Sequence, residues 1–287
     1  MINTESKPLV SVIMPSYNQG QFIEDTIRSI LNQDYPNLEV IVVDGQSSDG
    51  TLDVLKRYED RITYVSERDK GQSDAINKGF RMANGDIVAW LNSDDIYPDR
   101  KAVSGIVAAF TRHPEFDFIY GDFIEIDSHN RVLRIYKRPG YSHARLLRIG
   151  YISQPATFFR RCVVEKMPVR EDLRYAMDLE YWLRAHSLNF KFKHINFLIA
   201  AERLHEDAKC VRDNSDMAIE ARAVRLNYGA SFNRLYTVYR FFDRVLLYLL
   251  RLPGIFDLAL YRNAPERLTI PLTFEGAMKR TLLFRYL

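Results

Sequence analysis

Cysteine is almost absent from this sequence of 287 residues, which contains only Cys162 and Cys210. The two do not form a Cys-x-x-Cys pair, so neither a disulfide framework nor a cysteine-based zinc site is expected. A reducing compartment is therefore the natural location. The first residues are polar and show no signal peptide, and no apolar run approaches the roughly 20 residues that a membrane-spanning helix needs. We expect a cytoplasmic protein, either free or held peripherally on the cytosolic face of the inner membrane.

A strong charge of one sign is also lacking, since the formal net charge is only +3. The charge is unevenly placed, because basic residues outnumber acidic ones from Arg234 to the C-terminus while the preceding part is close to neutral. This distribution predicts no nucleic-acid partner. It suggests instead that the C-terminal part meets anionic surfaces.

The first 120 residues alternate short apolar strands with amphipathic helices. Strands that are apolar throughout and separated by such helices indicate a parallel sheet covered on both faces. The strands are expected at 9–14, 38–43, 62–65 and 87–91, with a fifth opened by 118–120. From about Asp122 the pattern changes. It predicts a hairpin over 123–126 and 132–136, an extended 156–160, a helix near 178–186, a strand over 190–200 and helices after about Asp213.

Polar residues gather where the first four strands end. In sheets of this kind ligands bind beyond the carboxyl ends of the strands. The residues at these ends are Ser16, Tyr17, Asn18, Asp44, Asp69, Asp94 and Asp95. The coincidence predicts a ligand site at this edge of the sheet.

Two aspartates at neighbouring strand ends, Asp44 and Asp69, could accept hydrogen bonds from a nucleotide base. A strand-end Asp is also often only a turn former or a cap for the residues that follow it. For an isolated Asp the second interpretation would be favoured. Two of them at adjacent strand ends favour the first.

The cluster Asn92-Ser93-Asp94-Asp95 follows the fourth strand directly. Asp94 and Asp95 offer hard oxygen ligands that suit Mg²⁺ or Mn²⁺ bridging a diphosphate, and Asn92 could add a carbonyl ligand or a hydrogen bond. His205 is a further candidate ligand through a neutral imidazole. A lone His in a polar stretch is, however, more often a surface residue.

Asp178 is the candidate general base, near the start of the helix expected over 178–186 and flanked by aromatic residues. There it could take a proton from an acceptor hydroxyl. The alternative is an aspartate that stabilises the dipole of its own helix. Glu180 is the competing carboxylate.

Four segments, in order and at fitting spacing, resemble the family 2 glycosyltransferases: Val10–Asn18, Glu39–Gly50, Gly71–Gly79 and Gly85–Asp95. The resemblance implies an α/β protein of GT-A fold, a Rossmann-like nucleotide-binding sheet flanked by helices, here with a C-terminal helical extension. It also implies an inverting single displacement with a UDP-sugar or similar nucleotide-sugar donor, and Mn²⁺ or Mg²⁺ as cofactor.

Carried over residue by residue, the resemblance implies that Asp178 is the catalytic base, although Met177-Asp178 stands where the family usually has Glu-Asp. Asn92 likewise replaces the first acid of the metal-binding motif. The implied metal ligands are Asp94, Asp95 and His205. The implied donor-binding residues are Pro15, Ser16, Tyr17, Asn18, Asp44, Asp69, Gln72, Asn77, Asn92, Ser93 and Asp94.

Several motifs of other classes are missing. A dinucleotide-dependent oxidoreductase needs Gly-x-Gly-x-x-Gly after the first strand, and a nucleotidyltransferase needs a glycine-rich phosphate loop there. This chain has Pro15-Ser-Tyr-Asn-Gln-Gly-Gln21 instead. A non-catalytic carbohydrate-binding module would lack the base or the metal ligands. The Gln-x-x-Arg-Trp motif of processive family members is absent too, so a non-processive bacterial enzyme is expected.

Three regions are predicted: a nucleotide-sugar-binding half at 1–125, an acceptor-binding and catalytic-base half of the same domain at 126–212, and a helical extension at 213–287. The expected reaction moves one sugar to a hydroxyl of a glycan or of a polyprenyl-diphosphate-linked acceptor, in the assembly of cell-surface polysaccharide, O-antigen or capsule. Residues 234–262 could lie on the inner-membrane surface. Alternatively they pack on the catalytic domain or on a second subunit of a homo-oligomer.

Overall fold

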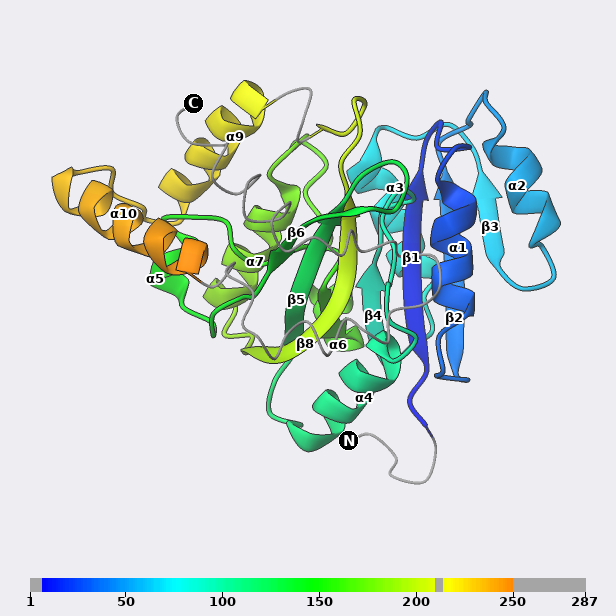
Figure 1. Ribbon diagram of the computed structural model, residues 1–287, viewed down its shortest axis with the longest axis horizontal. Coiled ribbons are helices and arrows are strands. Elements are labelled where there is room, and N and C mark those ends of the chain that lie inside the picture. The colour runs from blue at the N-terminus through cyan, green and yellow to red at the C-terminus, as the bar shows by residue number, and fades with distance from the viewer. Residues whose placement is uncertain (1–6, 210–213, 250–287) are drawn as a thin grey trace.

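The computed structural model describes residues 7–209 and 214–249, which form an eight-stranded sheet flanked by helices (Figure 1). The strand order is β3-β2-β1-β4-β7-β5-β6, with β8 paired to β5. The strands are β1 Val10–Ser16, β2 Leu38–Asp44, β3 Thr63–Ser66, β4 Ile87–Trp90, β5 Phe118–Ile126, β6 Val132–Tyr136, β7 Thr157–Arg160 and β8 Phe192–Arg203. The helices are α1 Ile23–Leu31, α2 Thr51–Arg57, α3 Gln72–Met82, α4 Ala102–Arg112, α5 His143–Leu146, α6 Arg161–Lys166, α7 Met177–Ser187, α9 Asn214–Asn227 and α10 Arg234–Leu249.

The first four strands are parallel, as the sequence predicts. Successive side chains of a strand point to opposite faces of a sheet, and both faces are buried here. Val12 of β1 packs with Ile27 of α1 on one face, while the adjacent Ile13 packs with Ile76 of α3 on the other. Helices α1, α2 and α4 therefore cover one face and α3 and α7 the other. The predicted α/β fold class is confirmed.

The second half of the sheet departs from the prediction in two respects. Residues 118–126 form the single strand β5, whereas the sequence predicted separate strands at 118–120 and 123–126. β5 is continuous because all of its residues except Glu125 are buried, and it bonds to β6, β7 and β8. The predicted boundary at residue 125 therefore falls inside a strand. β8 also continues to Arg203, beyond the predicted end at 200, and so reaches the carboxyl ends of the parallel strands.

An aromatic cluster joins the parallel strands to α7. Trp90 at the end of β4 stacks on Trp182 of α7, with ring centroids 6.1 Å apart and planes 18° from parallel. Tyr181, Phe118 and Phe159 pack edge-on or tilted around this pair. Both tryptophans are almost completely buried. The cluster therefore sets the position of α7 relative to the loop that follows β4.

The helices α9 and α10 lie at the end of the molecule opposite α2 and β3 (Figure 1). Asp243 fastens α10 to the domain, because its buried carboxylate forms ion pairs with Arg145 at 3.0 Å and with Arg148. The hydroxyl of Tyr236 adds a hydrogen bond to the carbonyl of Arg148. None of the described helices is long and apolar enough to cross a bilayer. The part of the expected surface segment at 250–262 lies outside the described residues.

Replacing Trp182 by Ala should lower the free energy of unfolding by about 3–5 kcal/mol, because the change empties a closely packed aromatic site. The measurement is a denaturant titration followed by circular dichroism. Leu188→Ala is the matched control at the end of the same helix, where the side chain is exposed, and should cost less than about 0.5 kcal/mol. Equal losses in the two variants would contradict the structural role of Trp182.

Candidate active site

The loops after β1 and β2 are tied together by hydrogen bonds. The backbone N–H of Asn18 donates to Ser47 Oγ at 2.7 Å, and the N–H of Ser48 donates back to Asn18 Oδ1 at 2.9 Å. Farther on, Gly20 N–H donates to Asp49 Oδ2. Asn18 has a positive φ of 52°, a conformation that Asn tolerates better than most residues. These bonds fix the loop that the sequence predicts to line a nucleotide.

Asp44 is fully buried at the end of β2. Its carboxylate accepts hydrogen bonds from the N–H and hydroxyl of Ser47 and from the hydroxyl of Ser66. The two bonds from Ser47 are the local bonds of a turn-forming Asp, the alternative that the sequence left open, and the bond from Ser66 ties β3 to this turn. Contact of Asp44 with a base stays a prediction, since here the residue shapes the loop.

The side chains of Tyr17 and Asp69 both lie close to Gly45. A Cβ on Gly45 would lie 2.7 Å from Asp69 Oδ2 and 3.2 Å from the Tyr17 ring, so only glycine lets the two side chains approach there. Tyr17 is 62% exposed although it is aromatic. Asp69 also accepts the N–H of Gly71 and so orders the turn before α3. An exposed ring beside a carboxylate is suited to stacking against a base and hydrogen bonding to its edge.

The loop after β4 brings Asp94 to His205. Asp94 Oδ2 lies 3.0 Å from His205 Nε2, and the His205 ring packs on Phe22. Asp95 points elsewhere, because it accepts the N–H of Arg203 at 2.9 Å and the side-chain amide of Asn92 at 3.2 Å. Burial, with the charges of Asp94 and Glu202, raises the pKa of Asp95. Among the described residues no group of three or more His, Cys, Asp or Glu is arranged as a metal site.

Arg203 holds this loop in place. It was not among the site residues predicted from the sequence. Its buried guanidinium donates from Nε to the carbonyl oxygen of Asp94 at 2.7 Å and stacks over the Phe22 ring. Its own N–H binds Asp95. The signal in the sequence was Arg203 two residues before His205, but strand β8 was predicted to stop too early to bring it here.

Gln72, another predicted donor residue, is hydrogen-bonded to the loop after β4. Its amide donates to Asn92 Oδ1 at 2.8 Å and accepts from Lys209 Nζ at 2.7 Å. Ser93 and Pro15 are buried, and Ser16 Oγ is buried with no partner within the described residues. An unpartnered buried hydroxyl at a strand end is open to a ligand atom.

The donor contact of Asn77 stays a prediction, and in the structure the residue has partners within the chain. Its amide is occupied on both sides by the backbone of Val169, with which it exchanges hydrogen bonds of 2.8 and 2.9 Å, and it also reaches Glu171. Asn77 is buried on α3 and clamps the segment that leads to α7. The family motif at 71–79 identifies this segment but does not indicate the contact of Asn77 with Val169.

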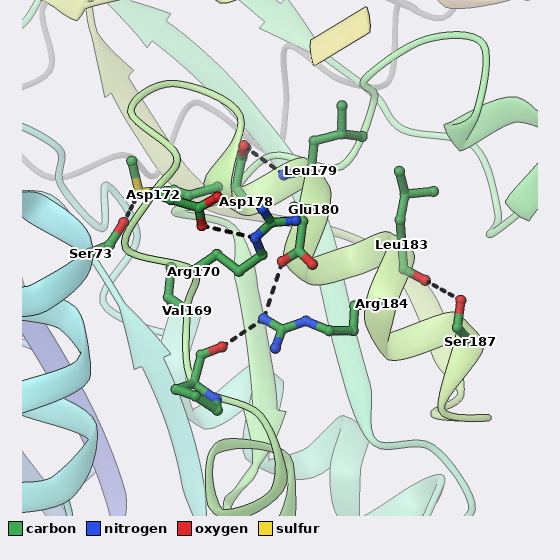
Figure 2. A network of polar contacts seen from close by, with 12 residues as sticks. Ser73, Val169, Arg170, Asp172, Asp178, Leu179, Glu180, Leu183, Arg184 and Ser187 are labelled. Atoms are coloured by element: carbon green, nitrogen blue, oxygen red, sulfur yellow. Dashed lines mark hydrogen bonds and ion pairs between the residues drawn. The ribbon is translucent and has the colours of Figure 1, made fainter. Parts of the chain in front are cut away.

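Asp178 lies in the first turn of α7, where its Oδ1 accepts the N–H of Leu179 at 2.7 Å (Figure 2). Burial raises the pKa of Asp178 to about 6. The competing carboxylate Glu180 is 1% exposed and is held by Arg184 at 3.1 Å and by the Tyr228 hydroxyl at 2.7 Å. Glu180 is therefore a packing residue, and Asp178 is the carboxylate suited to exchange a proton.

Two pockets open at this edge of the sheet. A pocket of about 290 Å³ lies between the start of α3 and the start of α7, and two of its lining residues are joined by a hydrogen bond from Ser73 Oγ to Met177 Sδ. Its lining residues are Lys70, Gly71, Gln72, Ser73, Glu171, Asp172, Leu173, Arg174, Met177 and Lys209. A second, of about 140 Å³, is lined by Asn18, Gln19, Gln21, Phe22, Asp49, His205 and Asp207. Each has one lining residue bonded to the loop of Asp94: Gln72 of the first pocket to Asn92, and His205 of the second to Asp94.

Known glycosyltransferases are similar to this chain in sequence. TuaG of Bacillus subtilis, a glycosyltransferase assigned to teichuronic acid biosynthesis, is 44% identical over 119 residues, which cover 40% of this chain and 47% of TuaG. Chondroitin synthase of Escherichia coli is 29% identical over 210 residues, covering 71% of this chain and 30% of that protein. The chain thus spans about half or less of the length of these curated relatives.

Solved structures share the fold. TarS of S. aureus in complex with UDP-GlcNAc superposes with a TM-score of 0.64 at 18% identity, over 89% of this chain and 79% of that one. Mannosyltransferase PcManGT of Pyrobaculum calidifontis, in complex with GDP-Man and Mn²⁺, gives 0.63 at 20% identity, over 90% and 79%. This likeness shows the GT-A fold.

The family model described as "Glycosyl transferase family 2" matches residues 11–167, more than half of the chain. The match runs from β1 through the donor loops and the Asp94 loop to α6, and it ends before α7. This chain belongs to glycosyl transferase family 2.

Proposed function

We propose that this enzyme is an inverting, metal-dependent glycosyltransferase that moves one sugar from a nucleotide-sugar donor, with UDP-sugars favoured, to an acceptor hydroxyl. The observation that carries the proposal is the pair Asp94–His205, which stands between the tied donor loops and the pocket at the start of α7. The residues proposed to bind the nucleotide-sugar, the two proposed metal ligands and a carboxylate with a raised pKa would thus share one edge of the sheet.

The donor nucleotide would lie over the loops after β1, β2 and β3. Tyr17 and Asp69 are placed to stack on and hydrogen bond to the base, and Ser16 Oγ is a buried hydroxyl in need of a partner. The complexes of TarS with UDP-GlcNAc and of PcManGT with GDP-Man support this class of ligand. Gln72 and Asn92, bonded to each other, would face the diphosphate or the sugar.

The residues present fit a divalent cation. A carboxylate and an imidazole directed at one another at 3.0 Å provide two ligands of the kind that Mn²⁺ accepts, and diphosphate oxygens could complete the set. A cation held there would neutralise charge on the departing nucleoside diphosphate. We assign Asp94 and His205 to this role. Asp95, also expected as a ligand, keeps the loop closed through Arg203 and Asn92.

Asp178 would act as general base. The acceptor oxygen attacks the anomeric carbon from the side opposite the diphosphate, its proton passes to the Asp178 carboxylate, and the bond between the anomeric carbon and the diphosphate oxygen breaks. The configuration at that carbon inverts in this single displacement. A base with a pKa near the working pH combines adequate basicity with the correct protonation state. The pocket of about 290 Å³ beside Met177 would admit the acceptor.

The acceptor is proposed to be a glycan or a polyprenyl-diphosphate-linked glycan of cell-surface polysaccharide, such as O-antigen or capsule. The similarity to TuaG and to chondroitin synthase supports a polysaccharide product. The α10 helix supports a lipid-linked acceptor, since it exposes a broad apolar face. Phe241 is 63% exposed and Phe242 61%. Such a face, with Arg244 beside it, suits the interfacial region of a membrane containing anionic lipid.

The pH dependence should report Asp178. In the wild type, kcat/KM should fall roughly tenfold per pH unit below about pH 6 and level off above it, because only the ionised carboxylate accepts the proton. Asp178→Asn should lower kcat by about 10²–10⁴-fold without this acid limb. The measurement is release of UDP from UDP-GlcNAc, or of GDP from GDP-mannose, with Mn²⁺ present. Glu180→Gln, a carboxylate of the same helix, serves as control and should keep the limb. Wild-type turnover in Asp178→Asn would remove the base assignment.

The proposed metal-binding role of Asp94 and His205 can be tested by substitution of His205. Changing His205 to Ala should raise the Mn²⁺ concentration needed for half-maximal activity by about 10–100-fold, since one of two protein ligands is lost. His194→Ala is the control, because this histidine is bonded to Asp122 away from the loop. Manganese titration of donor turnover is the measurement. An unchanged titration curve for His205→Ala would contradict its role as a ligand.

The proposed membrane contact predicts that Phe241→Ser with Phe242→Ser reduces binding to vesicles containing anionic phospholipid, because two inserted aromatic side chains are lost. Flotation of the intact chain with such vesicles is the measurement. Thr237→Ser, an exposed polar position of the same helix, is the control. If the double variant floats like the wild type but changes from dimer to monomer in light scattering, the face is a subunit interface and the membrane proposal fails.

A further inference from the structure

One carboxylate of α9 binds three consecutive backbone N–H groups directly before α7. Glu220 Oε1 accepts the N–H groups of Ala176 at 2.8 Å, Tyr175 at 2.9 Å and Arg174 at 3.1 Å. Its Oε2 accepts the Arg174 N–H as well, at 3.2 Å. Hydrogen bonds to an ionised acceptor are stronger than neutral ones, and successive N–H groups that converge form a concave anion site. Glu220 fills this site from a different helix.

The start of α7 needs such a partner. Its N-cap residue is Ala176, whose side chain cannot accept a hydrogen bond, and the positive end of the helix dipole points toward Glu220. Met177 precedes Asp178 and offers no carboxylate of its own. The turn that carries Asp178 is thus held from outside by an anion.

The contact belongs to a continuous face of α9. Glu220 and Val224 are spaced by four and so lie on one side of α9, and Tyr228 follows directly after the last residue of the helix. Val224 is buried in the core cluster that contains Trp182, and Tyr228 donates its hydroxyl to Glu180. This part of the chain therefore packs against α7, and Glu220 is its contact with the residues directly before Met177.

We propose that Glu220 is a positioning residue for transfer, which fixes the first turn of α7 and thereby the carboxylate of Asp178. The inference rests on the proposed role of Asp178 as base. It assigns part of the active site to α9, which lies beyond residue 167, where the family match ends. The helical extension thus completes the site and is more than a surface attachment.

Charges on α9 also act on Asp178. Arg225 lowers the pKa of Asp178, and the negative charge of Glu220 raises it, both less than burial does. From β8, Glu202 faces the same region, where burial raises its pKa to about 7 and the charge of Asp178 contributes. Glu180 of α7 is held by Arg184 and Tyr228. Removing the charge of Glu220 should thus make Asp178 more acidic, and removing that of Arg225 should make it less acidic.

The experiment compares kcat, donor KM and the pH profile of nucleotide release, with UDP-GlcNAc or GDP-mannose and Mn²⁺, in the full chain. Glu220→Ala should lower kcat about tenfold or more with donor KM within about twofold, because the base loses its alignment while the donor loops are untouched. Glu220→Gln keeps an acceptor oxygen and should retain more activity, with the acid limb moved to lower pH. Arg225→Gln should move the limb to higher pH. Asp216→Asn removes one negative charge from an exposed position of α9 and should change neither quantity.

Circular dichroism melting of each variant separates misalignment from unfolding. If Glu220→Ala is too unstable to assay, the direction of the shift in Glu220→Gln decides. Wild-type kcat and an unmoved limb in Glu220→Gln, beside an inactive Asp178→Asn, would overturn the positioning role and leave the proposed function standing. Full activity in Asp178→Asn would overturn both.

Discussion

The stack of Trp90 on Trp182 is the contact on which the geometry of the site depends. Trp90 ends the strand that leads into the Asp94 loop, and Trp182 lies one helical turn beyond Asp178. The two groups proposed for leaving-group stabilisation and proton transfer are far apart in sequence, yet they are joined through one rigid aromatic cluster. Side chains in a closely packed interior have little room to shift, so this contact fixes the position of Asp178 relative to the Asp94 loop.

Around this contact the polar groups divide into two kinds. Asp44 and Asn77 are buried and hydrogen-bonded within the chain, Glu180 is buried between Arg184 and Tyr228, and all three hold loops and helices in place. Tyr17, Ser16 and the pair Asp94–His205 have capacity left for a ligand. Of this second kind, Ser16 Oγ is buried without a partner, a costly arrangement that a bound ligand atom would relieve, whereas Tyr17 is largely exposed and Asp94 is paired with His205. The same division places Glu220 with the holding groups, although it comes from the C-terminal extension.

The parallel half of the fold could be predicted from sequence because β1, β2 and β4 are largely apolar on both faces and each strand is followed by a helix of clear period. The second half could not, because β5 and β8 owe their length to pairing with strands distant in sequence, which local pattern does not report. Because β8 was predicted to end at residue 200, Arg203 was not expected at the site. The hydrogen bonds of Asn77 with Val169 could not be predicted either, because a motif identifies a segment and does not report the direction of a side chain. The role of Glu220 was not predicted because its contact with Ala176, 44 residues earlier in the chain, leaves no local pattern in the sequence.

The central claim is that one site combines the Asp94–His205 pair, the donor loops and Asp178. A crystal structure of the chain with UDP-GlcNAc and Mn²⁺ tests it most directly. The account predicts Mn²⁺ bound to Asp94 and His205 and to the diphosphate, the uracil beside Tyr17 and Asp69, and the anomeric carbon open toward Asp178. A metal bound without Asp94 and His205, or a donor whose anomeric carbon is turned away from Asp178, would contradict it.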